Sequence, residues 1–234
     1  MGGFSMNESN FISESDFAKL LDSIPNQSHA NVKLTREDWA WYFKVQYGSA
    51  LRPKEETKLT PKNFDLDNRI LTLNLTKTGW KKCKCSKFEK TKLISSDKDC
   101  KKCLGEGWLR IPQKTTIDPR DIKGLREYLK NKDPDKVLWP VNRVTVWNKF
   151  KQMCQDANLH FHFEKKERAF DDNPYLLRSS RAKIMERLQA PHSYVKLKLR
   201  HTLGSDVTLA YTMPDINALL GWENEAYKVR MVKA

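Results

Sequence analysis

The sequence from Pro174 to Tyr211 reads PYLLRSSRAKIMERLQAPHSYVKLKLRHTLGSDVTLAY. Arg178 lies at the entry to a helical pattern, and the segment ends with His201 and, ten residues later, Tyr211. These three side chains are a guanidinium that stays charged, an imidazole and a phenol. The rest of the chain decides whether they belong to one site.

The excess of basic residues is the most informative global property of the 234-residue chain. Lys and Arg number 43 against 29 Asp and Glu, and the formal net charge is +14. A surplus of this size favours a polyanionic partner, first of all nucleic acid, over the alternative of an ordinary basic protein. No stretch approaches the ~20 apolar residues of a membrane span, and no signal peptide precedes the first helix. We therefore expect a cytoplasmic protein that associates with DNA.

Two helices and a strand are expected in the first half of the chain. Residues 1–12 are interpreted as a flexible arm or tag. A short helix follows Ser13, and Thr35 is the expected N-cap of a second helix that is rich in aromatic residues. The alternating pattern from Arg69 to Leu75 predicts a strand that turns at Thr76–Gly79.

The segment Gly48–Glu55 resembles the first sequence box of the tyrosine recombinase (phage integrase) family, Gly-x-Arg-x-x-Glu. The segment from Pro174 to Tyr211 resembles the C-terminal signature of the same family. The resemblance implies an α+β, mainly α fold, in which a helical bundle carries a small antiparallel sheet, and it makes 13–211 the catalytic domain. The candidate catalytic residues, in chain order, are Arg52, Lys77, Tyr175, Arg178, His201 and Tyr211.

The resemblance also implies roles for the two arginines and for the acid beside them. Arg52 and Arg178 would hold the phosphate oxygens with planar forks that stay charged. Glu55 is placed to orient Arg52, since it follows at a spacing of one helical turn. Two fixed positive groups of this kind stabilise the extra negative charge of the transition state.

Three further residues would carry the nucleophile and the protons. Tyr211 would attack the phosphorus, Lys77 would protonate the leaving 5′ oxygen, and His201 would donate a hydrogen bond to the phosphate. The covalent tyrosyl bond conserves the energy of the phosphodiester, so neither a nucleotide cofactor nor a catalytic metal is expected. The function implied is site-specific recombination through a 3′-phosphotyrosyl intermediate, in the integration or excision of a mobile element.

Tyr175 departs from the family pattern, which has a histidine three residues before the arginine. A tyrosine hydroxyl is a poor base near neutral pH, because its pKa is about 10. The sequence is in this respect most similar to integrases of archaeal viruses and plasmids. Two alternatives stay open: an enzyme similar to a type IB topoisomerase, and a catalytically inactive, zinc-containing DNA-binding protein on a recombinase scaffold.

Two close pairs of cysteines interrupt the expected strand pair. Cys83 and Cys85 form the first pair, and Cys100 and Cys103 form the second. This spacing predicts a structural zinc site of four thiolates, so 80–107 is interpreted as an inserted zinc-binding hairpin that touches DNA or a neighbouring protomer. An iron–sulfur cluster and free thiols are the weaker alternatives, and Cys154 is expected in the core.

The remaining segments complete the expected organisation. The return strand of the hairpin is predicted at Trp108–Pro112, and helices are predicted from Asp118, Thr145, Ser179 and Pro191. Residues 158–173 are expected to form an irregular loop against DNA. Residues 212–234 are interpreted as a C-terminal helix that docks on a neighbouring subunit, since the family implies a dimer or tetramer on DNA.

Overall fold

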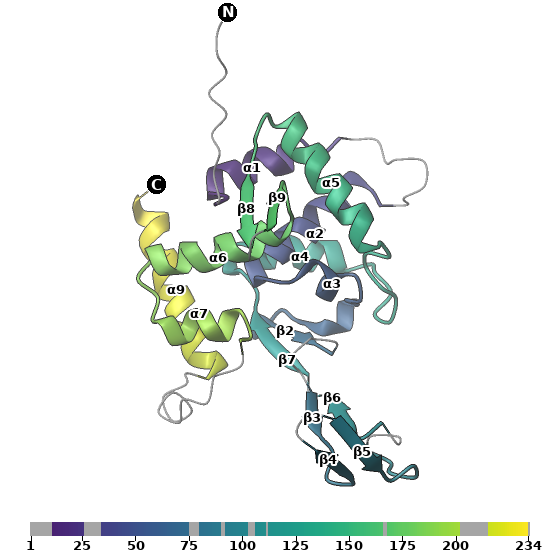
Figure 1. Cartoon of the computed structure of the whole chain (residues 1–234). Helices are drawn as coiled ribbons and strands as arrows, with labels where there is room; N and C mark the ends of the chain where they lie inside the picture. Colours follow the sequence, from purple (N-terminus) through teal and green to yellow (C-terminus); the bar gives the residue numbers. More distant parts are fainter. Residues whose placement is uncertain are drawn as a thin grey trace, which may run out of the picture.

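The computed structural model describes residues 11–25, 34–74, 80–89, 92–102, 106–110, 112–165, 168–201 and 215–233. Within these ranges the chain forms a mainly helical body and a smaller group of strands that extends from one end of it (Figure 1). Antiparallel pairs account for all of the described strands. The expectation of a helical bundle with small antiparallel sheets is confirmed.

The centre of the body is helix α2 (Arg36–Ser49), which is buried on nearly all sides. Its first turn is fixed by a capping box, in which the Thr35 hydroxyl accepts from the Asp38 amide and the Asp38 carboxylate accepts from Thr35. The same device begins α1 (Glu14–Asp22) at Ser13. Around α2 pack α4 (Ile122–Leu129), which follows the 3₁₀ turn η2 (Pro119–Asp121), and α5 (Arg143–Asp156). Aromatic and aliphatic side chains from these helices form one continuous core.

A three-stranded sheet follows the short helix α3 (Pro53–Glu56) and the 3₁₀ turn η1 (Pro61–Asn63). Its order is β1 (Phe64–Asp65), β2 (Ile70–Leu73), β7 (Gln113–Thr116), and β2 pairs with β7 in the register Leu71↔Thr115. A strand does form within the predicted return segment Trp108–Pro112, as β6 (Trp108–Arg110), but it pairs with β3 (Trp80–Lys82) and not with β2. The partner of β2 begins at Gln113, because Leu71 and Thr115 must both face the buried side of the sheet.

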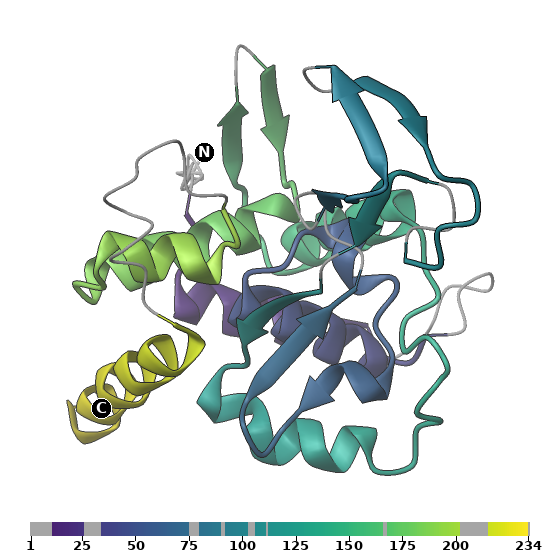
Figure 2. The same ribbon diagram turned by 90° about the horizontal axis from the view of Figure 1, so that it is seen from below.

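Four strands between β2 and β7 form a separate lobe, which we call the cysteine module (residues 80–110). Strand β3 (Trp80–Lys82) pairs with β6 (Trp108–Arg110), and β4 (Ser86–Glu89) pairs with β5 (Lys92–Ser96). Figures 1 and 2 show this lobe projecting from the body beyond the ends of β2 and β7. The segment 80–107, predicted as an inserted zinc-binding hairpin, lies within these bounds.

The segment predicted as an irregular loop, 158–173, instead contains a β-hairpin. Strand β8 (His162–Lys165) pairs with β9 (Arg168–Asp171). The base of the hairpin is closed by Phe161 and Asp172, which exchange two hydrogen bonds of 2.9 Å through the backbone and the Asp172 carboxylate. The charged composition of this segment therefore did not exclude strands.

Three helices complete the chain: α6 (Tyr175–Arg187), α7 (His192–Lys198) and α9 (Ile216–Lys233). Helix α6 begins four residues before the predicted Ser179, because the Asn173 side chain accepts from the Tyr175 amide and supports an earlier first turn. Helix α9 packs against α7 and β7 of the same chain, where Lys198 and Glu223, both fully buried, form an ion pair of 2.8 Å. No helix in the described part of the chain is long and apolar enough to cross a membrane.

Candidate functional site

Three arginines from distant parts of the sequence meet around Glu55, and we call this group the arginine cluster. Arg52 is the N-cap residue of α3, Arg178 is in the first turn of α6, and Arg200 follows α7. The two carboxylate oxygens of Glu55 are divided between two of them: Oε1 accepts from Arg52 Nη1 at 2.8 Å and Oε2 accepts from Arg200 Nη2 at 2.8 Å. One carboxylate thus fixes two guanidinium groups.

The C-terminal end of α2 provides the remaining support of the cluster. Ala50 ends this helix in the left-handed conformation, with φ of 51°. Its carbonyl accepts hydrogen bonds from Arg178 and, at 3.1 Å, from Arg200. The last carbonyls of a helix carry partial negative charge, so they favour cations at this end. Arg178 also donates to the Leu199 carbonyl, which ties α6 to the end of α7.

The three arginines differ in their access to solvent. Arg178 is 1% exposed and Arg200 is 5% exposed, whereas the side chain of Arg52 is 21% exposed. In this conformation the guanidinium of Arg178 is turned to main-chain carbonyls. Arg52 is therefore the member of the cluster that an external phosphate reaches first.

The close positive charges shift the proton affinities of the site. Burial, reinforced by Arg200 and Arg52, lowers the pKa of Arg178 to about 10. Burial by itself would raise the pKa of Glu55, but Arg200 and Arg52 hold it below its usual range, so the carboxylate is ionised near neutral pH. A cluster with three cations and one anion carries a surplus of positive charge, which suits an anionic ligand.

His201 and Tyr175 lie at the edge of the cluster. His201 is exposed, and its pKa is lowered by partial burial and by the charges of Arg178, Arg52 and Arg200. Its neutral form, with one donor and one acceptor nitrogen, is thereby favoured. Tyr175 is half-buried one helical turn before Arg178 and is close enough to influence the charge of that arginine.

The structure thus brings together five of the residues singled out from the sequence: Arg52, Glu55, Tyr175, Arg178 and His201. The predicted general acid Lys77 and the predicted nucleophile Tyr211 both lie outside the described residues.

Sequence reasoning missed Arg200. A signal was present, because Arg200 immediately precedes His201 and any fold that brings His201 to the site brings its neighbour nearby. What the sequence did not show is that Arg200 has a left-handed backbone, with φ of 51°. That conformation follows the end of α7, and the Arg200 side chain reaches back to Glu55.

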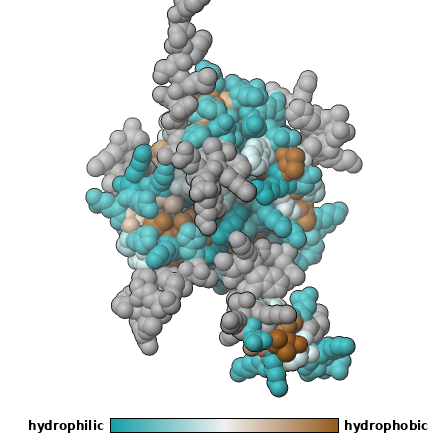
Figure 3. All heavy atoms as spheres, viewed as in Figure 1, coloured by the Kyte–Doolittle hydropathy of each residue, from teal (hydrophilic) through white to brown (hydrophobic). Residues whose placement is uncertain are grey.

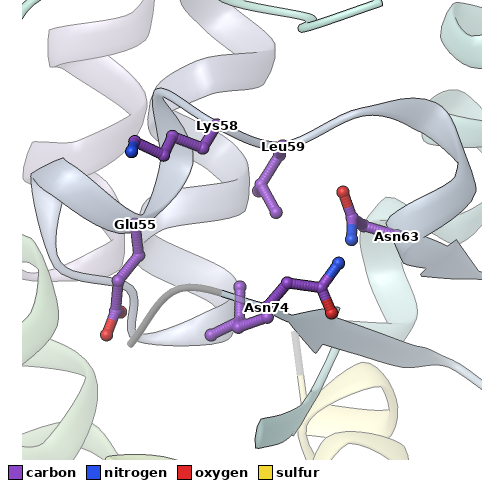
Figure 4. Close-up of a pocket in the computed structure, with 6 residues that line it drawn as sticks. Glu55, Lys58, Leu59, Asn63 and Asn74 are labelled. Atoms are coloured by element: carbon purple, nitrogen blue, oxygen red, sulfur yellow. The ribbon is translucent and has the colours of Figure 1, made fainter. Parts of the chain in front are cut away.

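A small pocket adjoins the cluster on the side of the sheet. Its walls include Glu55, Lys58, Asn63 and Asn74. Figure 4 shows the amide groups of Asn63 and Asn74 turned toward one another, with Glu55 and Lys58 on the α3 side. Asn74 directly follows β2, so the last described residue before the cysteine module lies beside the arginine cluster.

A second candidate site lies in the cysteine module. The sulfur atoms of Cys83, Cys85 and Cys100 all lie within 4.8 Å of one another, and those of Cys83 and Cys100 are 3.8 Å apart. Zinc–sulfur bonds of about 2.3 Å in a tetrahedron give sulfur separations of about 3.8 Å. The three thiols therefore fit a zinc ion. Cys103, the predicted fourth ligand, lies outside the described residues.

The backbone around these sulfurs is held in tight turns. The Ser86 amide donates to the Cys83 carbonyl at 3.1 Å, and the Cys100 amide donates to the Asp97 carbonyl at 3.3 Å. Gly107, with φ of +72°, accepts from the Cys83 amide at 2.9 Å. A side chain at Gly107 would be strained by that φ and would also collide with Leu93. Cys154, as predicted, is buried in the core of the body.

Comparison with solved structures identifies the fold as that of the tyrosine recombinase catalytic domain. XerA recombinase has 16% sequence identity and a TM-score of 0.50, over 92% of this chain and 64% of that one. XerH recombinase, in a post-cleavage complex with palindromic difH substrate, has 16% identity and a TM-score of 0.52, over 94% and 54%. A Tn1549 transposon integrase fragment, in complex with circular intermediate DNA, has 14% identity and a TM-score of 0.51, over 96% and 67%.

This chain therefore spans between about half and two thirds of the length of these three chains, one of which is itself a fragment. No protein-family model and no curated protein matches the sequence.

Proposed function

We propose that this chain is a site-specific DNA recombinase or integrase that cuts and rejoins DNA strands through a 3′-phosphotyrosyl intermediate. The observation that carries the proposal is the arginine cluster, in which Glu55 holds Arg52 and Arg200 on a recombinase fold. Of the three structures described above, one is a complex with circular intermediate DNA and another is a complex with difH substrate after cleavage. The net charge of +14 agrees with a DNA substrate.

In this proposal the cluster binds the scissile phosphate. Arg52, whose side chain is partly exposed, donates to a non-bridging oxygen, while the buried Arg178 and Arg200 contribute positive charge from the protein interior. Because Glu55 and the Ala50 carbonyl already fix these groups, little reorganisation is needed when negative charge develops on the phosphate.

Tyr211 and Lys77 complete the proposed reaction. The hydroxyl oxygen of Tyr211 forms a bond to phosphorus as its proton passes to solvent water, and the bond from phosphorus to the 5′ oxygen breaks. Lys77 gives a proton to that oxygen, and His201 donates a hydrogen bond to the phosphate. Attack by a 5′ hydroxyl from another strand reverses these steps and completes the exchange, without a nucleotide cofactor or a catalytic metal.

A nicked duplex tests the proposal, because loss of the short fragment past the nick traps the covalent adduct. Trapping on a library of sites, followed by proteolysis, identifies the peptide that carries the nucleotide. We expect Tyr211 to be labelled, and Tyr211→Phe to lose the adduct while DNA binding persists. Label on Tyr175, Tyr194 or Tyr227 would overturn the assignment of the nucleophile but keep the class of enzyme.

Two observations favour the second candidate, a DNA-binding protein on a recombinase scaffold. Arg178 is buried and bonded to main-chain carbonyls, and Tyr175 replaces the expected histidine. DNA binding with no adduct on any trapped site would support this candidate. An enzyme similar to a type IB topoisomerase would instead form the adduct and relax supercoiled DNA as a monomer, whereas the recombinase that we propose assembles as a dimer or tetramer on DNA.

A further inference from the structure

We propose that exposed lysines of the cysteine module form a second DNA contact, which extends the interface from the arginine cluster along the phosphate backbone. This inference rests on the proposed DNA substrate but concerns residues outside the reaction. The surface is defined by five lysines that are all exposed: Lys84, Lys87, Lys98, Lys101 and Lys102. We call them the lysine surface.

The lysine surface keeps its positive charge. Between residues 80 and 107 the sequence has nine lysines and four acidic residues. A zinc ion with four thiolates would carry two net negative charges, which leaves the module positive. Among the residues that the structure describes, no carboxylate forms an ion pair with any member of the lysine surface. The carboxylate of Asp97 instead accepts from the Asp99 amide within its own turn.

The backbone that carries the lysines forms a constrained frame and is not a flexible tail. Lys84 lies between Cys83 and Cys85, and Lys101 and Lys102 follow Cys100 directly. The frame is also held by Phe88 and Trp108, whose rings make an edge contact with centroids 4.5 Å apart. Fixing the backbone in advance reduces the entropy lost when side chains bind a ligand.

The position of the module agrees with a duplex that also reaches the arginine cluster. Asn74, the last described residue before the module, shares a pocket with Glu55. The lobe extends away from the body (Figures 1 and 2). A DNA duplex that crosses the arginine cluster and continues in the direction of the lobe would therefore pass beside the surface of the lobe. Since a DNA duplex carries one negative charge per ~1.7 Å of its axis, such an extension meets additional phosphates.

The chemistry of the lobe favours DNA over a second protein. Figure 3 shows hydrophilic residues over much of the lobe around a small hydrophobic spot. In the described part of the module, Ile94 is the one large hydrophobic residue that is strongly exposed, at 57%. Protein interfaces have an apolar core and are poor in lysine, whereas lysine-to-phosphate contacts need no apolar area.

The test compares two variants with the same change of charge. Lys101→Gln/Lys102→Gln removes two cations from the module, and Lys123→Gln/Lys130→Gln removes two exposed cations from α4 and its C-cap, remote from the module. Binding to one duplex is measured by fluorescence anisotropy between 50 and 200 mM salt. Zinc content and urea unfolding are measured on both variants to verify that the fold is kept.

We expect the module variant to bind roughly tenfold more weakly and to reduce the slope of log affinity against log salt by up to about 1.8, at about 0.9 per lost phosphate contact. The matched variant should differ from the wild type by much less. The DNA footprint of the matched variant should be unchanged, while the DNA footprint of the module variant should shorten at one end.

Equal losses of DNA affinity in the two variants would overturn the proposal, since DNA binding would then depend only on the total charge of the chain. Unchanged DNA affinity with a lower mass of the protein–DNA assembly would also overturn it and would assign the lysine surface to a neighbouring protomer. The adduct assay tests the proposed function separately. If the chain forms no adduct, but the module variant still binds DNA more weakly than the matched variant, the recombinase function is rejected and the second DNA contact is kept.

Discussion

In the helical body, buried side chains from Ile12 to Ile184 form one continuous core, whereas in the described part of the cysteine module only Cys83 and Gly107 are buried. The body therefore gains its stability from the removal of apolar surface from water. The module is too small to do so, and it is held by short strands, one aromatic pair and a cluster of thiols. The two regions should respond differently to the same perturbation.

The largest effect is expected from a cavity in the body. Phe43 is fully buried against Trp39, Tyr42 and Phe150. Phe43→Ala should lower the free energy of unfolding by about 3–5 kcal/mol, measured by urea denaturation. Val144→Ala, at a residue that is 66% exposed, is the control and should change it by less than about 0.5 kcal/mol. If Phe43→Ala also released zinc from the folded protein, the two regions would not be independent.

A loss of activity without a loss of fold is expected at the arginine cluster. Arg52→Ala should raise the activation free energy of adduct formation by about 2.7–4 kcal/mol, by analogy with the removal of one oxyanion donor. The Arg52 side chain is partly exposed, so the free energy of unfolding should change little. Tyr175→Phe should cost less, because a tyrosine is a weak base at neutral pH. A larger loss for Tyr175→Phe would show that Tyr175 has the more direct role.

Removal of the metal should affect the module far more than the body. We expect freshly purified protein to contain one zinc per chain, held by Cys83, Cys85, Cys100 and Cys103, and Cys85→Ser to lose it. Hydrogen exchange should then accelerate in β3 to β6, while the free energy of unfolding of the body changes by less than about 1 kcal/mol. Substoichiometric zinc in reduced, freshly purified protein would contradict this, and Cys154→Ser is the control cysteine variant.

The smallest effect is a pH dependence that has one sign at a single carboxyl group of the body, Asp121, and the opposite sign in the cysteine module. Burial, with Asp118 nearby, raises the pKa of Asp121 to about 6. A carboxyl whose folded pKa is above its unfolded value contributes stability at low pH, and that contribution is lost as the pH rises through about 6. Asp121→Asn should therefore stabilise the body at pH 7.5 by roughly 1 kcal/mol and make little difference at pH 4.5.

The stability of the module should instead increase as the pH rises over the same range, because protons compete with zinc for the thiolates at low pH. Zinc release between pH 7.5 and 5, followed with a chromogenic chelator, checks this half of the comparison. Equal stabilities of the wild type and Asp121→Asn at both pH values would show that the pKa of Asp121 is not raised on folding.

The sequence by itself determined the features that depend on neighbouring residues. The capping boxes at Ser13 and Thr35, the pairing of Arg52 with Glu55 three residues later, and the closeness of Cys83 to Cys85 all follow from local spacing. The basic charge of the chain and of the module is likewise a matter of composition.

Only the tertiary structure decided the features that join distant segments. The strand that pairs with β2 begins at Gln113 rather than Trp108, since register depends on which side of the sheet is buried. Arg200 joins Glu55 across 145 residues of sequence, and Arg178 is turned to the carbonyls of Ala50 and Leu199. Such contacts depend on how α2, α6 and α7 pack, because a buried guanidinium must find its hydrogen-bond acceptors wherever the folded chain places them.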